Sequence, residues 1–111
     1  MKITTWNARG LNAPSKICLL KHNLKQFDSK IIMLQETKLN KEEGVKLGKK
    51  LGSWNINLHE SRGASRGLGM IWYPRKVNIN MIHSNNSWMS RKIKSIKMNL
   101  QLFVINIYVP T

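Results

Sequence analysis

Acidic residues are scarce in this chain of 111 residues, which has five Asp and Glu against 19 Lys and Arg and a formal net charge of +14. Because 41% of the residues are apolar, close to an ordinary globular composition, a solvated basic tail is excluded. The charge must therefore lie on a folded surface, and such a surface repels itself unless it meets an anion. Nucleic acid is the first partner to expect, followed by an anionic membrane surface or phosphorylated small molecules.

Cysteine and long apolar runs are also lacking. The single cysteine, Cys18, excludes an internal disulfide and favours an intracellular compartment. The longest purely apolar runs have four residues, such as 31–34 and 102–105, whereas a membrane span needs about 20. The first residues include polar Thr4, Thr5 and Asn7, so we expect no signal peptide and no membrane-spanning segment.

The apolar pattern of the first third of the chain predicts a strand, a helix and a second strand. Residues 2–6 form a short β-prone run that ends in a polar loop. After Pro14, apolar residues at steps of three and four up to Phe27 predict an amphipathic helix, with Ser15 as its N-cap. The unbroken apolar run 31–34 suits a strand covered on both faces. Together these elements predict a βαβ unit with parallel strands.

The rest of the chain predicts one more helix and several strands. A helix over 41–51 has Asn40 as N-cap, Glu43 at the capping-box position and Gly52 as its stop, although Gly44 and Gly48 weaken it. Residues 60–67 indicate a loop. Segment 88–100 fits a helical stripe but lies among strands, so we interpret it as a strand. The remaining predicted strands are residues 54–58, 68–73, 77–83 and 101–108.

Two polar residues follow the predicted parallel strands. Asn7 comes directly after the first strand and Glu36 directly after the second. If the strands are neighbours, both side chains lie at the same sheet edge, where ligands bind in open α/β sheets. A carboxylate with an amide oxygen suits Mg²⁺ or Mn²⁺ held against a phosphate. The alternative is that Asn7 is a turn residue and Glu36 a solvated strand end.

Four motifs occur in order along the chain. They are Thr5-Trp6-Asn7-Ala8-Arg9-Gly10-Leu11-Asn12, Leu34-Gln35-Glu36-Thr37-Lys38-Leu39, Arg66-Gly67-Leu68-Gly69-Met70 and Asn106-Ile107-Tyr108-Val109-Pro110. Together they resemble the endonuclease/exonuclease/phosphatase superfamily, which has the DNase-I-like fold. Within it, the chain is most similar to the N-terminal endonuclease of plant LINE-type non-LTR retrotransposons. The resemblance covers residue 2 to the end and implies a partial four-layer sandwich, an N-terminal half with one mixed sheet and two helices.

The resemblance implies roles for individual residues. Asn7 and Glu36 would bind Mg²⁺ or Mn²⁺, and the hydroxyl of Tyr108 would contact the scissile phosphate as a catalytic group. Arg9 stands where retrotransposon relatives often carry Arg, and Thr111 where the family often has Asn. A DNA-facing loop would contain Arg62 and Arg66, so the predicted nucleic-acid-binding residues are Arg9, Arg62, Arg66 and Thr111.

The family places further catalytic residues downstream, and this sequence lacks them. A Gly-Asp-Phe-Asn segment and a late Asp-His pair would position and activate the attacking water, and the three histidines here all precede Tyr108. We therefore interpret residues 1–111 as a truncated domain of a metal-dependent DNA endonuclease, inactive alone and nuclear. Its expected partners are DNA, the missing C-terminal half and a reverse transcriptase module. The alternatives are a non-catalytic basic nucleic-acid binder or a phosphatase of the same superfamily.

Truncation predicts uncovered apolar positions, because the absent half would supply most of the second sheet. Ile71, Val104 and Ile105 are expected to lose their cover and to form a patch that drives association.

Several other features have both a functional and a plain structural interpretation. Cys18 and His22 have a zinc-ligand spacing but no second pair, so we favour a packed cysteine and a surface histidine. The four tryptophans are either base-stacking platforms or, for the three in or beside strands, core residues. The loop with Arg62 and Arg66 is either a phosphate contact or a flexible polar turn. A basic strip is either a solvated strand edge, which we favour, or a DNA-backbone contact; it comprises Arg91, Lys92, Lys94 and Lys97.

Overall fold

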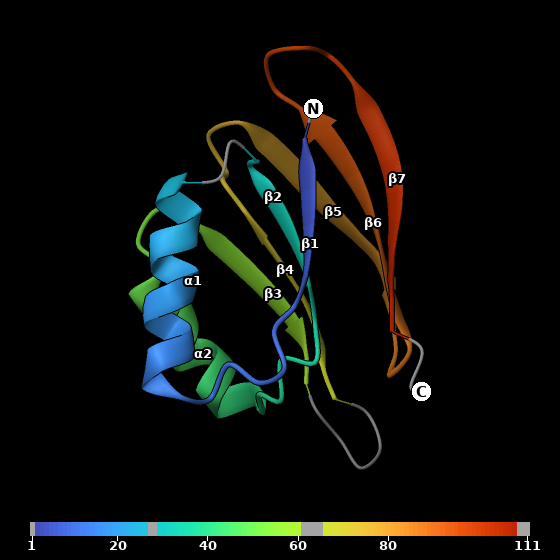
Figure 1. Cartoon of the computed structure of the whole chain (residues 1–111). Coiled ribbons are helices and arrows are strands. Elements are labelled where there is room, and N and C mark those ends of the chain that lie inside the picture. Colours follow the sequence, from blue (N-terminus) through green and yellow to red (C-terminus); the bar gives the residue numbers. More distant parts are fainter. Residues whose placement is uncertain (1, 27–28, 61–65, 109–111) are drawn as a thin grey trace.

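The computed structural model describes residues 2–26, 29–60 and 66–108, which form two β-sheets stacked face to face with two helices on the outer face of the first sheet (Figure 1). The first sheet has the strand order β1-β2-β4-β3 and the second the order β5-β6-β7. The helices are α1 (Pro14–Gln26) and α2 (Lys41–Lys50). The strands are β1 (Ile3–Asn7), β2 (Ile31–Gln35), β3 (Asn55–His59), β4 (Leu68–Trp72), β5 (Val77–Ser84), β6 (Trp88–Ser95) and β7 (Gln101–Ile107).

The predicted βαβ unit is confirmed, because β1 and β2 pair in parallel with Asn7 opposite Gln35. The prediction of Ser15 as N-cap is wrong. Helix α1 already begins at Pro14, and the carbonyl of Ala13 accepts from the backbone N–H groups of Lys16 and Ile17. Proline suits the first helical position, since its fixed φ is helical and its missing N–H would have no partner there.

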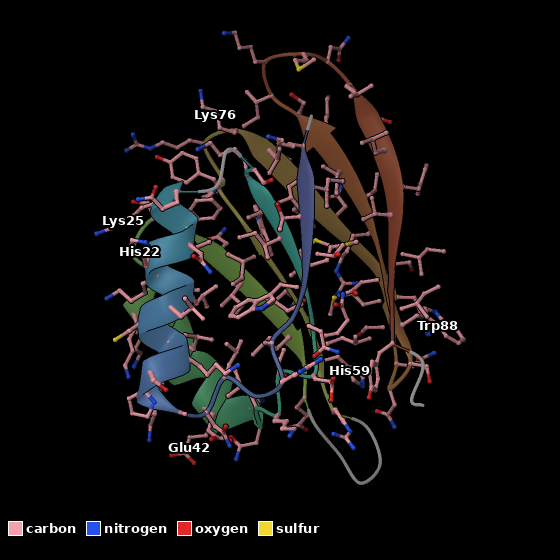
Figure 2. All side chains as sticks on the ribbon, viewed as in Figure 1. His22, Lys25, Glu42, His59, Lys76 and Trp88 are labelled. Atoms are coloured by element: carbon pink, nitrogen blue, oxygen red, sulfur yellow. The ribbon has the colours of Figure 1, made fainter. Side chains whose placement is uncertain are left out.

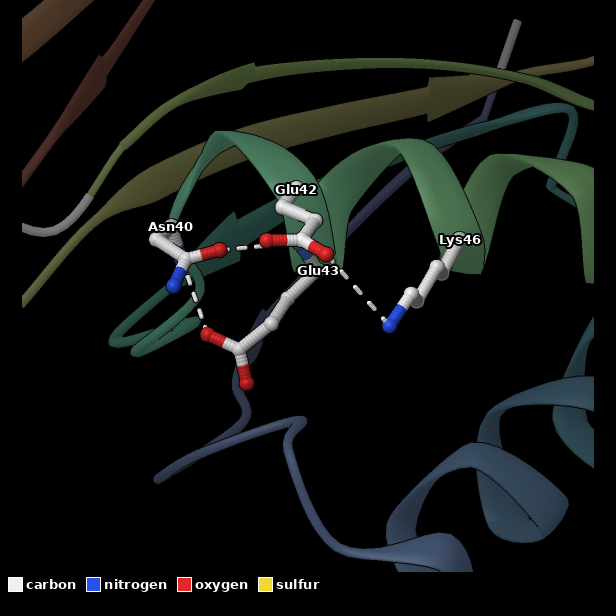
Figure 3. Close-up of polar contacts among 4 residues, drawn as sticks. All are labelled: Asn40, Glu42, Glu43 and Lys46. Carbon is white, nitrogen blue, oxygen red and sulfur yellow. Dashed lines mark hydrogen bonds and ion pairs between the residues drawn. The ribbon is translucent and has the colours of Figure 1, made fainter.

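Helix α2 is capped as its sequence predicts. The Asn40 side chain accepts a hydrogen bond from the Glu43 backbone N–H (2.8 Å), and the Glu43 carboxylate accepts one from the Asn40 N–H at 3.2 Å (Figure 3). The exposed Glu42–Lys46 pair at 3.7 Å, drawn in the same figure, contributes little because water screens it. The helix ends before Gly52, which has a φ of +65°.

Two glycines inside α2 let this helix lie directly against β3. A Cβ atom on Gly44 would stand 2.6 Å from Cδ1 of Leu58, and one on Gly48 would stand 3.2 Å from Cγ2 of Ile56. Both distances are shorter than an ordinary carbon contact, so only glycine allows this close approach. Glycine lowers the helix propensity of α2 at these two positions, and the close packing against β3 compensates.

The first sheet is covered on both faces. Its helix-facing side chains join α1 and α2 in one buried core, and its other face packs against the second sheet. The run Ile31–Leu34 alternates between these two cores, as expected for a strand covered on both faces. Ile71 is fully buried among the helix-facing residues, so the prediction that it lies uncovered is wrong.

Within the described residues, the second sheet has three antiparallel strands and is covered on one face only. The prediction that Val104 lies uncovered is wrong, because its side chain points toward the first sheet and is half-buried. Ile105 points outward and is 57% exposed, as predicted. The interpretation of 88–100 as a strand holds for 88–95. Met89 and Ile93 lie on one face in either structure because a spacing of four fits both periods, and the turn that follows carries exposed Ile96 and Leu100.

Candidate active site

Three loops meet at one edge of the first sheet and are joined by backbone hydrogen bonds. The loop after β1 donates to the loop after β2 through Ala8, Gly10 and Leu11, whose N–H groups reach the carbonyls of Gln35, Glu36 and Thr37 at 2.9, 2.7 and 2.8 Å. The loop after β2 in turn donates to the segment before β4, from Thr37 to Gly67 at 3.3 Å and from Lys38 to Arg66 at 2.7 Å. The first three sequence motifs therefore form one continuous substructure.

This substructure holds several residues in left-handed backbone conformations. Glu36 has a φ of +52°, Arg9 of +51° and Lys38 of +54°. Non-glycine residues adopt this region rarely and at an energetic cost, so the surrounding hydrogen bonds must enforce it. Gly67 has a φ of +86°, and a Cβ there would overlap the hydroxyl of the buried Thr37. The backbone around Glu36 is thus held by the loop after β1 on one side and by the segment before β4 on the other.

The Glu36 carboxylate is buried, with 9% of the residue exposed, and two polar side chains meet it. Nη1 of Arg66 donates to Oε1 of Glu36 at 3.1 Å. A hydrogen bond from the Asn7 side chain is the largest influence on the pKa of Glu36 and lowers it; the charges of Arg66 and Lys38 also lower the pKa, whereas burial opposes the shift. Glu36 is therefore a carboxylate at neutral pH.

Asn7 is oriented by its own loop. Its Oδ1 atom accepts a hydrogen bond from the backbone N–H of Arg9 at 3.2 Å, which leaves the amide nitrogen to face Glu36 and a second lone pair on the oxygen. The predicted pair Asn7 and Glu36 does come together, with Arg66 as a third member. The sequence assigned Arg66 to nucleic acid and gave no sign of its ion pair with Glu36.

These residues fit a hard divalent cation. One ionised carboxylate and one amide oxygen are the oxygen ligands that Mg²⁺ accepts, with water and substrate phosphate completing its shell. Within residues 2–26, 29–60 and 66–108, no group of three or more His, Cys, Asp or Glu residues is placed to hold a metal. The described part of the chain therefore offers a partial ligand set, and the ion would share Glu36 with Arg66.

Tyr108 follows β7 at the same end of the sandwich. Its backbone N–H donates to Ser87 at 3.0 Å, and its half-buried side chain packs against the core between the sheets. The sequence missed the residue that positions it. Asn106 is buried within β7, donating from Nδ2 to the carbonyls of Leu34 and Gly69, both at 3.0 Å, and accepting from Nε2 of Gln35 at 2.7 Å.

Asn106 therefore ties the fourth motif to the strand that carries Glu36. The signal in the sequence was an amide within the apolar run 102–107, since buried polar groups need partners.

The other predicted DNA contacts divide into three groups. Arg9 is exposed beside Asn7, and Arg66 is half-exposed while paired with Glu36. Arg62 and Thr111 lie outside the described residues. The interpretation of the basic strip as a solvated strand edge is wrong, because β6 is the middle strand of its sheet and Lys97 lies in the turn after it. Arg91 is 2% exposed and points between the sheets, whereas Lys94 and Lys97 are exposed.

The remaining candidates are structural or isolated. Cys18 is exposed, so the prediction of a packed cysteine is wrong, and His22 lies on α1 away from the loops (Figure 2). Core packing is confirmed for three tryptophans, Trp6, Trp54 and Trp72, while Trp88 is 43% exposed. No helix in the described part of the chain has the length and apolar character needed to cross a membrane.

Comparison with known proteins gives solved structures only, because no family model and no curated protein matches the chain. TDP2 of D. rerio in complex with a single-stranded DNA product superposes with a TM-score of 0.67 at 16% identity, over 93% of this chain and 43% of that one. The catalytic domain of Xenopus laevis APE2 superposes with a TM-score of 0.63 at 21% identity, over 100% of this chain and 46% of that one. The chain has a partial DNase-I-like fold.

A D. rerio TDP2 humanized by 14 mutations matches similarly, with a TM-score of 0.61 at 16% identity over 93% of this chain and 45% of that one. The chain thus spans less than half the length of the structures it matches. The expected fold class, a partial DNase-I-like sandwich with a mixed sheet and two helices, is confirmed.

Proposed function

We propose that this chain is the N-terminal part of a divalent-metal-dependent DNA endonuclease of the LINE retrotransposon type, and that it does not cut DNA alone. The observation that carries the proposal is the meeting of Asn7, Glu36 and Arg66 on three loops joined by backbone hydrogen bonds. A buried carboxylate kept ionised at a strand end is suited to phosphate chemistry with a cation. The likeness in fold to a DNA-bound TDP2 supports DNA as the substrate class.

Each residue has a distinct part in this proposal. Glu36 and Asn7 would hold Mg²⁺ or Mn²⁺, which would neutralise the charge that develops on phosphate oxygens. Arg66 would leave Glu36 for a phosphate of the DNA, since a guanidinium binds phosphate as readily as carboxylate. The Tyr108 hydroxyl would donate to a nonbridging phosphate oxygen. The sequence has no Gly-Asp-Phe-Asn segment and no histidine after Tyr108 to activate the water, so hydrolysis needs further residues.

The second sheet suggests where those residues would dock. Phe103, Ile105 and Ile107 alternate along the outer face of β7 and are 73%, 57% and 56% exposed. Strand β7 is an edge strand without charge or proline, so it lacks the features that discourage pairing. The complementary half of the domain is the partner that this surface fits, and a reverse transcriptase module would follow it in a retrotransposon protein acting in the nucleus.

Plasmid nicking tests the proposal. The chain alone, incubated with supercoiled plasmid and Mg²⁺, should leave the plasmid intact. The chain mixed with, or fused to, a complementary C-terminal half should nick it, and Glu36→Gln, which keeps the shape but removes the charge, should abolish nicking. A completed protein that folds but does not nick with either Mg²⁺ or Mn²⁺ would refute the enzyme proposal.

A second candidate function is charge-driven binding of nucleic acid without catalysis. It is favoured by the ion pair, because Arg66 already compensates Glu36, and by the net charge of +14. It predicts DNA affinity that falls steeply with salt and ignores Glu36→Gln. The nuclease proposal instead predicts that Mg²⁺ strengthens DNA binding by the chain and that Glu36→Gln removes this gain. A lipid-phosphate release assay tests the third alternative, a phosphatase.

A further inference from the structure

A hollow of about 710 Å³ lies beside β3, outside the three-loop site. One wall is the face of α2 that carries Gly44 and Gly48, and the floor is formed by Ile56 and Leu58 of β3. The turn between β5 and β6, residues 84–86, closes the other side. Its lining combines five apolar residues, among them Val45, Ile56 and Leu58, with seven polar or charged ones. A hollow of this size with both kinds of surface suits small organic groups.

One end of the hollow, at His59, lies at the same sheet edge as Glu36. The strand registers place Gln35 of β2 opposite Leu68 of β4, and Leu68 opposite His59 of β3. His59 lines the hollow and lies at the end of its strand (Figure 2). Because neighbouring strands are about 4.8 Å apart, roughly 10 Å separates β3 from β2. That span is about one to two nucleotides of a DNA strand passing Glu36.

His59 makes the hollow a preformed feature. Its Nδ1 atom lies 3.2 Å from the Ser84 hydroxyl and its Nε2 atom 3.0 Å from Oδ1 of Asn86. The imidazole therefore links the end of β3 to the turn of the second sheet. Both ring nitrogens are engaged, so His59 is a structural bridge here and has no nitrogen left to act as a base.

Two amide groups that line the hollow have donors that no described residue uses. Oδ1 of Asn85 accepts from the backbone N–H groups of Ser87 (2.8 Å) and Trp88 (2.9 Å), which fixes the amide orientation. Oδ1 of Asn57 likewise accepts from Nη2 of Arg91 at 2.6 Å. Among the described residues, the Nδ2 atoms of Asn57 and Asn85 have no acceptor, and both residues line the hollow.

A buried positive charge lies behind one of these amides. Arg91 is 2% exposed and bonds only neutral oxygens among the described residues: those of Asn57, His83 and Ser90. Its Nε atom has no partner there, and burial lowers its pKa. The carboxylate that lines the hollow, Glu60, is already bonded to the Lys41 N–H at 3.0 Å. The amide end therefore favours a ligand that accepts hydrogen bonds.

We propose that this hollow binds a nucleobase of the DNA strand, with the ring against the apolar side chains of Val45, Ile56 and Leu58 and its carbonyl oxygens or ring nitrogens accepting from Asn57 and Asn85. A base combines a flat apolar ring with edge acceptors, which matches the apolar wall and the two donors. A phosphate would leave the apolar wall unused. The proposal rests on the proposed function in one respect, since it takes the ligand to be DNA.

Asn85→Asp is the sharpest probe of the base contact. The substitution keeps the Oδ1 atom that accepts from Ser87 and Trp88 but replaces the donor with a negative oxygen. Asn78→Asp is the matched control, because Asn78 is exposed at the far end of β5 and the charge change is identical. The ligands are a fluorescent oligothymidylate and a backbone of the same length without bases, measured by anisotropy in EDTA.

We expect the loss of affinity caused by Asn85→Asp to depend on the presence of bases in the ligand. Asn85→Asp should weaken oligothymidylate binding about fivefold more than Asn78→Asp does, which corresponds to one lost hydrogen bond. On the backbone without bases, the two variants should have equal effects. Val45→Trp, at an exposed position that lines the hollow, should also selectively weaken oligothymidylate binding.

Equal effects of Asn85→Asp and Asn78→Asp on oligothymidylate would overturn the proposal, provided that circular dichroism shows both variants folded. Thymidine monophosphate should also shift the amide NMR signals of Gly48 and Asn57, and a titration that leaves both unmoved would count against the site. Neither readout requires metal or cleavage, so failure of nicking with intact coupling would remove only the endonuclease proposal.

Discussion

The two sheets differ in how completely the described residues cover their faces. The first sheet has helices on one face and the second sheet on the other, and its fully buried side chains lie in two cores. The second sheet buries its inner face, while its last strand presents Phe103, Ile105 and Ile107 outward. Asn7, Glu36 and Arg66 lie on the first sheet, away from the exposed outer face of β7.

The sheets are joined by a small number of polar contacts. Asn106 of β7 reaches Leu34, Gln35 and Gly69, and Arg91 of β6 reaches Asn57. Directional hydrogen bonds fix one register between two sheets more strictly than apolar contact does. The inner face of β7 is therefore bonded to the first sheet through Asn106, whereas its outer face is exposed.

Breaking the Asn106 contact should have the largest effect on stability. Asn106→Ala leaves Nε2 of Gln35 and the carbonyls of Leu34 and Gly69 without this partner in a buried position. We expect a loss of about 3 kcal/mol in the free energy of unfolding, measured by urea denaturation. Asn78→Ala on the exposed side of β5 is the control and should change stability by less than about 0.5 kcal/mol. Equal losses in the two variants would contradict the role of Asn106.

Two glycine substitutions test how closely the loops of the first sheet are packed. Gly67 and Gly52 both have positive φ, but a Cβ at Gly67 would overlap the Thr37 hydroxyl, whereas Gly52 has open space around it. Gly52→Ala should cost about 1 kcal/mol for the backbone alone, and Gly67→Ala about 2 kcal/mol or more because overlap is added. Thermal unfolding measures the loss of stability in each variant. Equal decreases in Tm would show that the loop around Gly67 rearranges to accommodate the added Cβ atom.

Much of the fold was readable from local patterns. The capping box at Asn40 and Glu43, the doubly covered run at Ile31 and the strands near their predicted bounds all follow from neighbouring residues, whose physics is local. Asn7 and Glu36 were also predictable, because each directly follows a parallel strand and such strands end at one edge.

The features that the sequence did not predict depend on contacts between segments that are distant along the chain. A local sequence pattern does not indicate such contacts. Arg91 belongs to a run of basic residues that indicated a solvated edge, yet the alternation of β6 turns this one side chain inward, where Asn57 meets it. Ile71 lies under the helices rather than on the uncovered face, because the register of β4 against β2 pairs it with Ile32. Ser15 lost its predicted capping role because Pro14 competes for the helix start.

The ion pair at the site gives a smaller, measurable effect. Arg66→Gln removes the positive charge beside Glu36, so a divalent cation no longer competes with it. We expect Mn²⁺ binding to strengthen about fivefold, followed by electron paramagnetic resonance of free Mn²⁺. Arg75→Gln, on an exposed loop before β5, is the charge-matched control and should change binding much less. Weaker Mn²⁺ binding in Arg66→Gln would show that Arg66 supports the ligand geometry instead.

The outer face of β7 should give the smallest effect on stability and a clear effect on association. Phe103→Ser with Ile105→Thr removes exposed apolar area, so the free energy of unfolding should change by less than about 1 kcal/mol. Sedimentation velocity should show self-association of the parent chain at high concentration and its loss in the double variant. The control is Leu19→Ser, because Leu19 on α1 is also an exposed apolar residue (45%). This substitution should leave association unchanged. If the double variant associates as strongly as the parent chain, β7 is not the interface, and the contrast between the two sheets lies in burial alone.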